Sequence, residues 1–281
     1  MYKFPIGVML ESFSKPVAES LDLAVQVGAQ GLQIYATPSS LEAKGLTTPQ
    51  AQNEFLKMVK DHGLVISALC ADLGHGFGDA EKNPELIEKS KRILDLALKF
   101  GTNIATTHIG VVPADPSHPR YRVMQDACGE LARYADTVKA HFAIETGPEK
   151  SEVLRDFLDS LHSTGVAVNL DPANLVMVAG DDPVQAVRNL KKYIVHTHAK
   201  DGKKLTDNEP EVIYGLRPSP EKVMSPAFIE LPLGEGGVPF PEYLAALDEI
   251  GYKGFLTIER EVGDDPTADI RKAVVFLKNL L

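Results

Sequence analysis

The sequence predicts a parallel (β/α)8 barrel, the TIM-barrel architecture, as a single domain over residues 1–281. Two observations favour this fold class. Eight short apolar segments alternate with eight segments in which apolar residues recur at helical spacing. Each short segment is an unbroken apolar run, which is typical of parallel strands covered by helices on both faces. A doubly wound open sheet is the alternative, but the first strand–helix turn, MLESFSKP, lacks the G-x-G-x-x-G motif that would support it.

The first half of the chain supplies four strand–helix units. Its opening strand is a β-branched and apolar run that is too short to be a helix. After that run, Ser14 is a candidate N-cap, apolar side chains follow at helical spacing, and Gly28 ends the pattern. The same alternation then repeats three times. The expected strands are 5–12, 31–36, 64–71 and 103–110, and the expected helices are 17–27, 48–62, 83–100 and 119–139.

The second half repeats the alternation with one interruption. Asp182-Pro183 and Asp265-Pro266 mark two helix starts, because aspartate caps a first turn and proline fits at its first position. Residues 199–237 form a polar excursion through which apolar residues continue, so we interpret them as an insertion between the seventh strand and its helix. The expected strands are 141–146, 166–171, 193–198 and 253–259, and the expected helices are 151–163, 183–191, 239–251 and 266–281.

Composition excludes several classes of partner. The chain has 29 lysines and arginines against 39 acidic residues, a net charge of −10, which disfavours binding to a nucleic-acid backbone. No segment reaches the roughly 18 consecutive apolar residues of a membrane span. The two cysteines, Cys70 and Cys128, lie in an apolar and a helical context and are expected to be buried reduced thiols. We therefore expect a cytoplasmic protein that binds neither nucleic acid nor membrane.

Four residues that can hold a metal ion lie at the ends of the last four predicted strands. They are Glu145, Asp171, His198 and Glu259, and the gaps between them are 26, 27 and 61 residues. A gap of 26 or 27 corresponds to one strand–helix unit, and the gap of 61 is one unit enlarged by the insertion. The carboxyl ends of barrel strands share one mouth, and neighbouring strands are about 4.8 Å apart. These four side chains can therefore converge, and the insertion beside His198 is expected to set specificity.

Each of these residues has an ordinary structural explanation when it is considered alone. A carboxylate at a strand end often caps the next helix, and a histidine in a strand is often a hydrogen-bonded core residue. Three buried carboxylates without a cation, however, would repel one another at a large desolvation cost. The combination predicts a divalent metal site, and its mostly oxygen donors suit Mn²⁺, Mg²⁺ or Co²⁺ better than a structural zinc ion.

Two segments of the chain carry a resemblance to a known family. HTHAKD (196–201) and LPLGEGGVPFPEYLAALDEIGYKGFLTIERE (231–261) resemble the sugar phosphate isomerase/epimerase family of xylose-isomerase-like TIM barrels, within the AP endonuclease family 2 superfamily. The resemblance implies one divalent metal ion, Mn²⁺ first with Mg²⁺, Co²⁺ and Zn²⁺ as alternatives, held by Glu145, Asp171, His198 and Glu259. It also implies that Glu145 and Glu259 are the catalytic acid/base pair of an isomerase or epimerase. Such an enzyme moves a proton next to a carbonyl through a metal-stabilised enediolate.

Six further residues are predicted to contact the substrate. His108 closes the fourth strand, His75 lies in a glycine-rich loop, and His196 points to the same side of its strand as His198. Lys200 can meet a substrate oxyanion or pair with a carboxylate. The resemblance places a substrate-binding arginine in the insertion, which here is Arg217. The full set is His75, His108, Asn174, His196, Lys200 and Arg217.

Several functions remain open on the sequence alone. A keto-polyol (inosose-type) dehydratase would use the same metal and the same glutamate pair. A sugar-binding barrel without turnover would not need two carboxylates across the site. An apurinic endonuclease is disfavoured because Asn174 stands where several relatives carry a histidine, and because of the acidic charge. The expected partner is a small carbohydrate, phosphorylated or not, and relatives suggest a dimer or tetramer by analogy alone.

Overall fold

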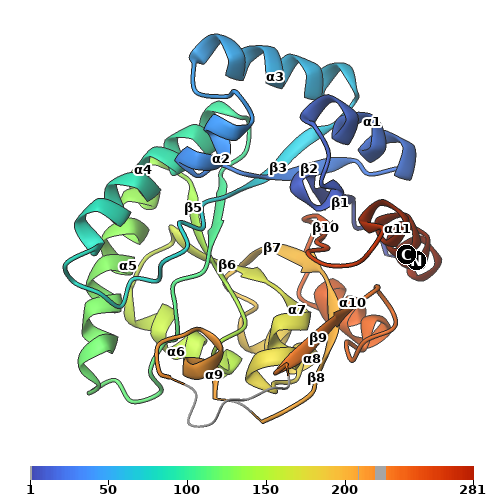
Figure 1. Cartoon of the computed structure of the whole chain (residues 1–281). Coiled ribbons are helices and arrows are strands. Elements are labelled where there is room, and N and C mark those ends of the chain that lie inside the picture. Colours follow the sequence, from blue (N-terminus) through green and yellow to red (C-terminus); the bar gives the residue numbers. More distant parts are fainter. Residues whose placement is uncertain (1, 208, 219–225) are drawn as a thin grey trace.

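Eight parallel strands close into a barrel in the computed structural model, which describes residues 2–207, 209–218 and 226–281 (Figure 1). The order around the barrel is β1-β10-β7-β6-β5-β4-β3-β2, so the strands that follow one another in the chain are neighbours in space. The predicted fold class is confirmed. The barrel strands are β1 (Ile6–Met9), β2 (Gly31–Tyr35), β3 (Val65–Cys70), β4 (Ile104–Thr107), β5 (His141–Glu145), β6 (Val166–Leu170), β7 (Ile194–Ala199) and β10 (Leu256–Ile258).

Helices surround the strands on the outside of the barrel (Figure 1). All eight predicted helices are present, with ends that differ from the predictions by three residues or fewer. They are α1 (Val17–Val27), α3 (Pro49–Asp61), α4 (Asn83–Lys99), α5 (Pro119–Val138), α6 (Ser151–Ser160), α8 (Pro183–Asn189), α10 (Phe240–Glu249) and α11 (Pro266–Leu280). None of the helices in the described residues is long and apolar enough to cross a membrane.

Short elements supplement this pattern. The described residues contain three more helices, α2 (Pro38–Ala43), α7 (Pro172–Asn174) and α9 (Pro210–Ile213). A 3-10 turn follows β1, and a π-helical turn, residues 175–179, follows α7. The prediction of Ser14 as an N-cap is wrong. Ser14 has a left-handed backbone (φ 54°) and ends the 3-10 turn, and α1 begins after Pro16 without a side-chain cap.

The predicted insertion folds as a two-stranded antiparallel ribbon. It consists of β8 (Asp201–Lys204) and β9 (Phe228–Leu231), with α9 between them. Both strands of the ribbon and α9 contact the π-helical turn after β6. The insertion therefore rests against the segment that follows Asp171, at the mouth of the barrel.

One buried carboxylate ties the start of this ribbon to the loop that follows it. Asp201 accepts hydrogen bonds from the backbone N–H groups of Gly202 and Val238 at one oxygen, and of Gly234 and Gly236 at the other, all at 2.9–3.0 Å. A Cβ on Gly236 would lie 2.0 Å from the Asp201 Oδ1, so only glycine permits this approach. The aspartate and the glycines of the recognised motif are therefore a structural unit.

The inside of the barrel is hydrogen-bonded rather than purely apolar. Gln33 donates to the Thr106 hydroxyl at 2.8 Å, and His196 contacts the Asn169 amide oxygen at 2.8 Å and the Thr257 hydroxyl at 2.9 Å. All five side chains are buried. Because side chains alternate along a strand, these polar groups face inward while their apolar neighbours pack under the helices. The polar layer supports the side chains at the mouth.

Candidate metal and active site

The four predicted metal ligands come together in the structure. Glu145 ends β5, Asp171 follows β6, His198 lies in β7 and Glu259 follows β10, and these four strands are consecutive in the barrel. One ligand atom from each residue lies within 4.8 Å of all the others. The side chains are at most 7% exposed. Strand ends that are fixed by sheet hydrogen bonding therefore hold a compact, buried group of three carboxylates and one imidazole.

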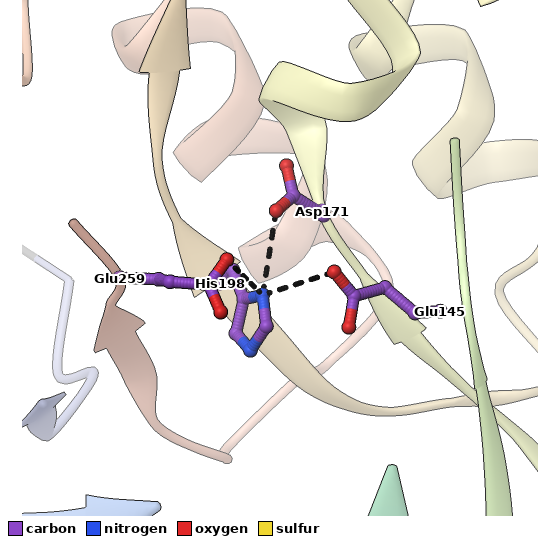
Figure 2. A group of neighbouring side chains, drawn as sticks. All are labelled: Glu145, Asp171, His198 and Glu259. Carbon is purple, nitrogen blue, oxygen red and sulfur yellow. Dashed lines mark hydrogen bonds and ion pairs between the residues drawn. The ribbon is translucent and has the colours of Figure 1, made fainter. Parts of the chain in front are cut away.

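The carboxylates converge on a single nitrogen (Figure 2). Nδ1 of His198 lies 3.3 Å from an oxygen of Asp171 and 3.4 Å from an oxygen each of Glu145 and Glu259. One ring nitrogen carries at most one proton, so it cannot satisfy three carboxylates. A divalent cation could interact with all three carboxylates and the ring nitrogen at once. The chemistry and the convergence of the group therefore fit a divalent cation better than a hydrogen-bonded cluster.

A glutamine sets the orientation of the histidine. Gln33 uses its Nε2 to donate to Thr106, so its oxygen is free to accept, and that oxygen lies 2.9 Å from Nε2 of His198. This contact is shorter than the 3.2 Å between Nε2 and the Asn169 amide nitrogen, so a proton on Nε2 is favoured. Nδ1 then faces the carboxylates, and it would offer its lone pair to a bound metal ion after losing its own proton. Gln33 was not among the predicted site residues. Its signal is a lone glutamine in the middle of the apolar run GLQIYA.

Amide groups hold Glu145 as a carboxylate. Asn169 donates to its Oε2 at 3.1 Å, and Asn174 donates to its Oε1 at 3.2 Å. Burial alone would raise the pKa of Glu145, but the positive charges of His108 and His198 outweigh burial and hold the pKa below its ordinary value. Asn174, which was predicted to contact the substrate, thus contacts a member of the buried group instead.

A lysine holds Glu259. The Lys200 ammonium lies 2.9 Å from a Glu259 oxygen, contacts Glu261 and is 3.6 Å from Glu230. Burial alone would lower the pKa of Lys200, but the surrounding carboxylates raise it well above its ordinary value. Burial would raise the pKa of Glu259, and His198 and Lys200 reverse that effect. Lys200 is therefore one half of a buried ion pair.

His108 forms a second polar pair beside the cluster. Its Nδ1 lies 2.9 Å from Asp72, and its Nε2 lies 3.6 Å from Glu145. Burial alone would lower the pKa of His108, but the charge of Glu145 and the hydrogen bond to Asp72 raise it to about 9. An imidazole in this environment is protonated at neutral pH. The sequence analysis named His108 but not Asp72, which closes β3 two residues after its last strand residue.

A cavity of about 640 Å³ opens over this group. Glu145 and Glu259 line it, whereas Asp171 and His198 lie behind its wall. Four of the predicted substrate contacts also line it, namely His75, His108, Asn174 and Lys200. Further lining residues that the sequence analysis did not single out for this role include Arg120, Tyr214 and Glu261.

Two predicted substrate contacts lie away from the cavity wall. His196 is 1% exposed inside the barrel, and both of its ring nitrogens contact side chains there. Burial lowers its pKa well below the ordinary value, with a further contribution from His198. Arg217 is 51% exposed and pairs with two carboxylates of the insertion. In this arrangement His196 supports the site from within the barrel, and Arg217 lies on the insertion surface.

Curated proteins with detectable similarity cover part of the chain. It is 29% identical over 161 residues to the rhizopine catabolism protein MocC of Rhizobium meliloti, a match that covers 57% of this chain and 47% of the relative. It is 30% identical over 122 residues to the uncharacterized protein YfiH of Bacillus subtilis, with 41% of this chain and 38% of the relative covered. The matched part is thus less than half the length of either relative.

Solved structures share the fold over nearly the whole chain. A xylose isomerase domain protein from Planctomyces limnophilus is 23% identical, with a TM-score of 0.80 and coverage of 99% of this chain and 96% of that chain. A probable 3-DHS dehydratase, AsbF, from Bacillus anthracis is 19% identical, with a TM-score of 0.76 and coverage of 98% and 99%. The 3-keto-D-glucoside 4-epimerase YcjR from E. coli is 15% identical, with a TM-score of 0.73 and coverage of 99% and 100%. At these identities the likeness is one of fold.

The family assignment rests on a match over most of the chain. The family model described as a xylose isomerase-like TIM barrel matches residues 21–280. That range includes seven of the eight barrel strands, the insertion and all four residues of the buried group. The closed parallel barrel agrees with it. The chain therefore belongs to the xylose isomerase-like TIM-barrel family.

Proposed function

We propose that this protein is a divalent-metal-dependent isomerase or epimerase of a small sugar or polyol. The proposed reaction is proton transfer at a carbon next to a carbonyl. Glu145 and Glu259 are the acid/base pair in this proposal, and together with Asp171 and His198 they hold the metal ion. A named epimerase is among the solved structures that share this fold, which supports the reaction class by analogy.

One observation carries the proposal. Of the four clustered residues, only the two glutamates line the cavity. They come from β5 and from the end of β10, with β6 and β7 between them in the barrel. A ligand on the cavity floor would thus have one carboxylate on each side. That is the arrangement required to remove a proton from one face of a carbon and return one to the other.

Neighbouring side chains prepare the two glutamates for this task. Asn169 and Asn174 fix the Glu145 carboxylate through its two oxygens, whereas Lys200 fixes Glu259 through one oxygen. Both carboxylates are ionised in the free protein because their pKa values are lowered by nearby positive charges. Each is therefore able to accept a proton, and the one that has accepted it can return it.

The buried group would hold one divalent ion, and Mn²⁺ is our first choice because three of its four ligands are carboxylates. When bound, the ion would supply positive charge that stabilises the oxyanion formed when the proton leaves. Gln33 keeps His198 in the required tautomer, as described above. Removal of either carboxylate base is expected to cost about 10²–10⁴-fold in rate.

Solvent exchange tests this proposal. A panel of ketoses and inososes is incubated with the protein and Mn²⁺ in D₂O, the metal is removed with excess chelator, and the sugars are read by NMR and mass. We expect deuterium at a carbon next to the carbonyl, and we expect Glu259→Gln to abolish it. Asp79→Asn, an exposed carboxylate of the same cavity, is the matched control and should exchange normally. Exchange that persists in Glu259→Gln would exclude Glu259 as a catalytic base.

A dehydratase is the second candidate, and His108 is the observation that favours it. Elimination of water requires an acid at the leaving hydroxyl, and His108 is protonated, lines the cavity and is held by Asp72. A named dehydratase is also among the structural neighbours. The same D₂O incubation separates the two functions, because elimination gives a product that is lighter by one water. In that event we expect His108→Gln to abolish the product.

A further inference from the structure

The positive side chains of the cavity wall are engaged by carboxylates. Among the described residues, three lysines and arginines line the cavity: Lys82, Arg120 and Lys200. Lys200 is bound in the ion pair with Glu259, and Lys82 lies 3.7 Å from Asp79. A phosphate or carboxylate ligand is normally held by a free arginine or lysine, which supplies charge and hydrogen-bond donors together. The pairing of Arg120 therefore decides whether the cavity can take an anion.

Arg120 is engaged by a residue of the insertion. Its Nη2 donates to Oε1 of Glu211, which belongs to α9, and the two residues are 91 positions apart in the sequence. The other oxygen of Glu211 lies 2.9 Å from Nε of Arg217. One carboxylate thus bridges the arginine on the cavity wall and the arginine that the sequence predicted to bind substrate. The Nε of Arg120 is buried and has no partner in the described part of the chain, so Glu211 is the group that neutralises it there.

The backbone near Arg120 also offers an anion few free N–H groups. Arg120 is the second residue of α5, where free N–H groups of a helix can bind phosphate. Here the His118 side chain caps the helix, because its Nδ1 accepts from the Arg120 N–H at 3.1 Å. The cavity wall also carries five carboxylates, Asp72, Asp79, Glu145, Glu259 and Glu261. A second negative group on the substrate would meet this charge without a free cation to bind.

We propose that Glu211 is a specificity determinant that restricts the cavity to uncharged sugars and polyols, because it pairs with Arg120 on the cavity wall. This inference rests on the proposed function for the class of substrate, and it excludes phosphorylated members of that class. Glu211 lies on the insertion and outside the metal group, so the selection is separate from the chemistry. Replacement of Glu211 should free the guanidinium of Arg120, whereas Arg217 keeps its pair with Glu209.

Calorimetric titration tests the proposal without turnover. The probes are inorganic phosphate, D-fructose and D-fructose 6-phosphate, each added to the full-length protein in one Mg²⁺ buffer. The proteins are the wild type, Glu211→Gln, Glu209→Gln and the Arg120→Gln/Glu211→Gln double variant. Glu209 is the matched control, because it pairs with Arg217 but not with Arg120. Phosphate that binds through a metal ion would appear equally in all four proteins and would cancel in the comparison.

We expect Glu211→Gln to bind phosphate and D-fructose 6-phosphate about 10- to 100-fold more tightly than the wild type, the gain of one or two charge-assisted hydrogen bonds. Glu209→Gln should match the wild type, and the double variant should lose the gain. No gain in Glu211→Gln would overturn the proposal. Tighter binding of D-fructose 6-phosphate than of D-fructose to the wild type, measured with a chelator in place of Mg²⁺, would also overturn it. If Glu211→Gln fails to fold, Arg120→Gln decides, because a loss of phosphate affinity relative to the wild type would show that Arg120 was free. Because only binding is measured, failure of the isomerase proposal in D₂O leaves this result unaffected.

Discussion

The floor and the rim of the cavity are built on different principles. On the floor, four side chains from consecutive strand ends are buried, and three carboxylates among them surround one nitrogen of His198. At the rim, Glu211 of α9 and the flanking Glu209 form ion pairs with Arg217, which is half exposed. Sheet hydrogen bonds fix the floor, whereas the rim depends on side chains of a surface helix. The buried group on the floor and the ion pairs at the rim therefore lie on separate elements. In the proposed function, chemistry and substrate choice can thus be changed independently.

The largest effect is expected when the floor loses a ligand. Asp171→Ala and His198→Ala should each weaken Mn²⁺ binding by more than about 100-fold, because two carboxylates and one remaining ligand no longer enclose the ion. Metal content after purification and titration of the metal-free protein measure this. Asp79→Asn, which removes a carboxylate at the rim, should bind about one ion per chain with the wild-type affinity. A double variant with full metal content would show that the ion is held elsewhere.

The next largest effect is expected at Asp201, which lies between the buried metal-ligand group and the rim. Asp201→Asn replaces one of two acceptor oxygens by an N–H₂ group that faces two backbone N–H donors. Each lost hydrogen bond to a charged group is worth about 1.5–3 kcal/mol, so the ribbon should detach before the barrel unfolds. Hydrogen exchange should rise in β8 and β9 and stay low in β5 and β6. Uniform exchange across both regions would mean that the ribbon is not a separate unit.

A smaller effect is expected behind the floor. Gln33→Leu removes the acceptor for Nε2 of His198 while it keeps a similar volume, so the ring loses its fixed tautomer. Metal affinity should fall by about 10- to 100-fold, whereas the melting temperature of the metal-free protein should change little. Gln52→Leu, which removes a glutamine from outside the barrel, is the control. An unchanged affinity would remove Gln33 from the metal site.

The last prediction concerns Glu149, a buried carboxyl group near the cavity. Glu149 accepts from the Val112 N–H at 3.1 Å with one oxygen, and its other oxygen is buried without a partner in the described residues. Burial raises its pKa to about 8. A raised pKa in the folded state stabilises the protein below the unfolded value near 4.5, and this contribution is lost as pH rises through about 8. The free energy of unfolding of Glu149→Gln should therefore exceed that of the wild type at pH 8, by up to about 5 kcal/mol, and should equal it at pH 4. Glu152→Gln, which changes an exposed residue, is the control and should show no such pH dependence. A stability difference between the wild type and Glu149→Gln that is the same at pH 4 and pH 8 would contradict the assignment.

The sequence predicted those parts of the fold that depend on local patterns. Apolar runs and helical spacing located every barrel strand and its helix, because both signals are carried within a dozen residues. No helix was predicted between residues 36 and 48, where Thr37 caps α2 and Pro38 opens it. Ser14 was misassigned because a short polar residue also fits the left-handed end of a turn. Such errors arise where one residue type suits two local structures.

The site was predictable only in part, for a related reason. The ligand group follows from topology, since consecutive strand ends of a parallel barrel share one mouth. Gln33 and His198 are 165 residues apart, and Arg120 and Glu211 are 91 apart, so no local pattern links them. For the same reason, the sequence did not identify the carboxylates that pair with Lys200. Pairing across the barrel is decided by packing of the whole chain.

The hydrogen bonds of Asp201 have a consequence for how this barrel can diversify. One carboxylate ties the start of β8 to the loop that follows β9, and neither Lys204 nor Phe228 takes part in these contacts. The cost of closing a loop grows only slowly with its length. The chain between Lys204 and Phe228 can therefore be lengthened, shortened or exchanged while His198 and Lys200 keep their places. A new surface can thus be added at the barrel mouth without a change in the buried group of Glu145, Asp171, His198 and Glu259.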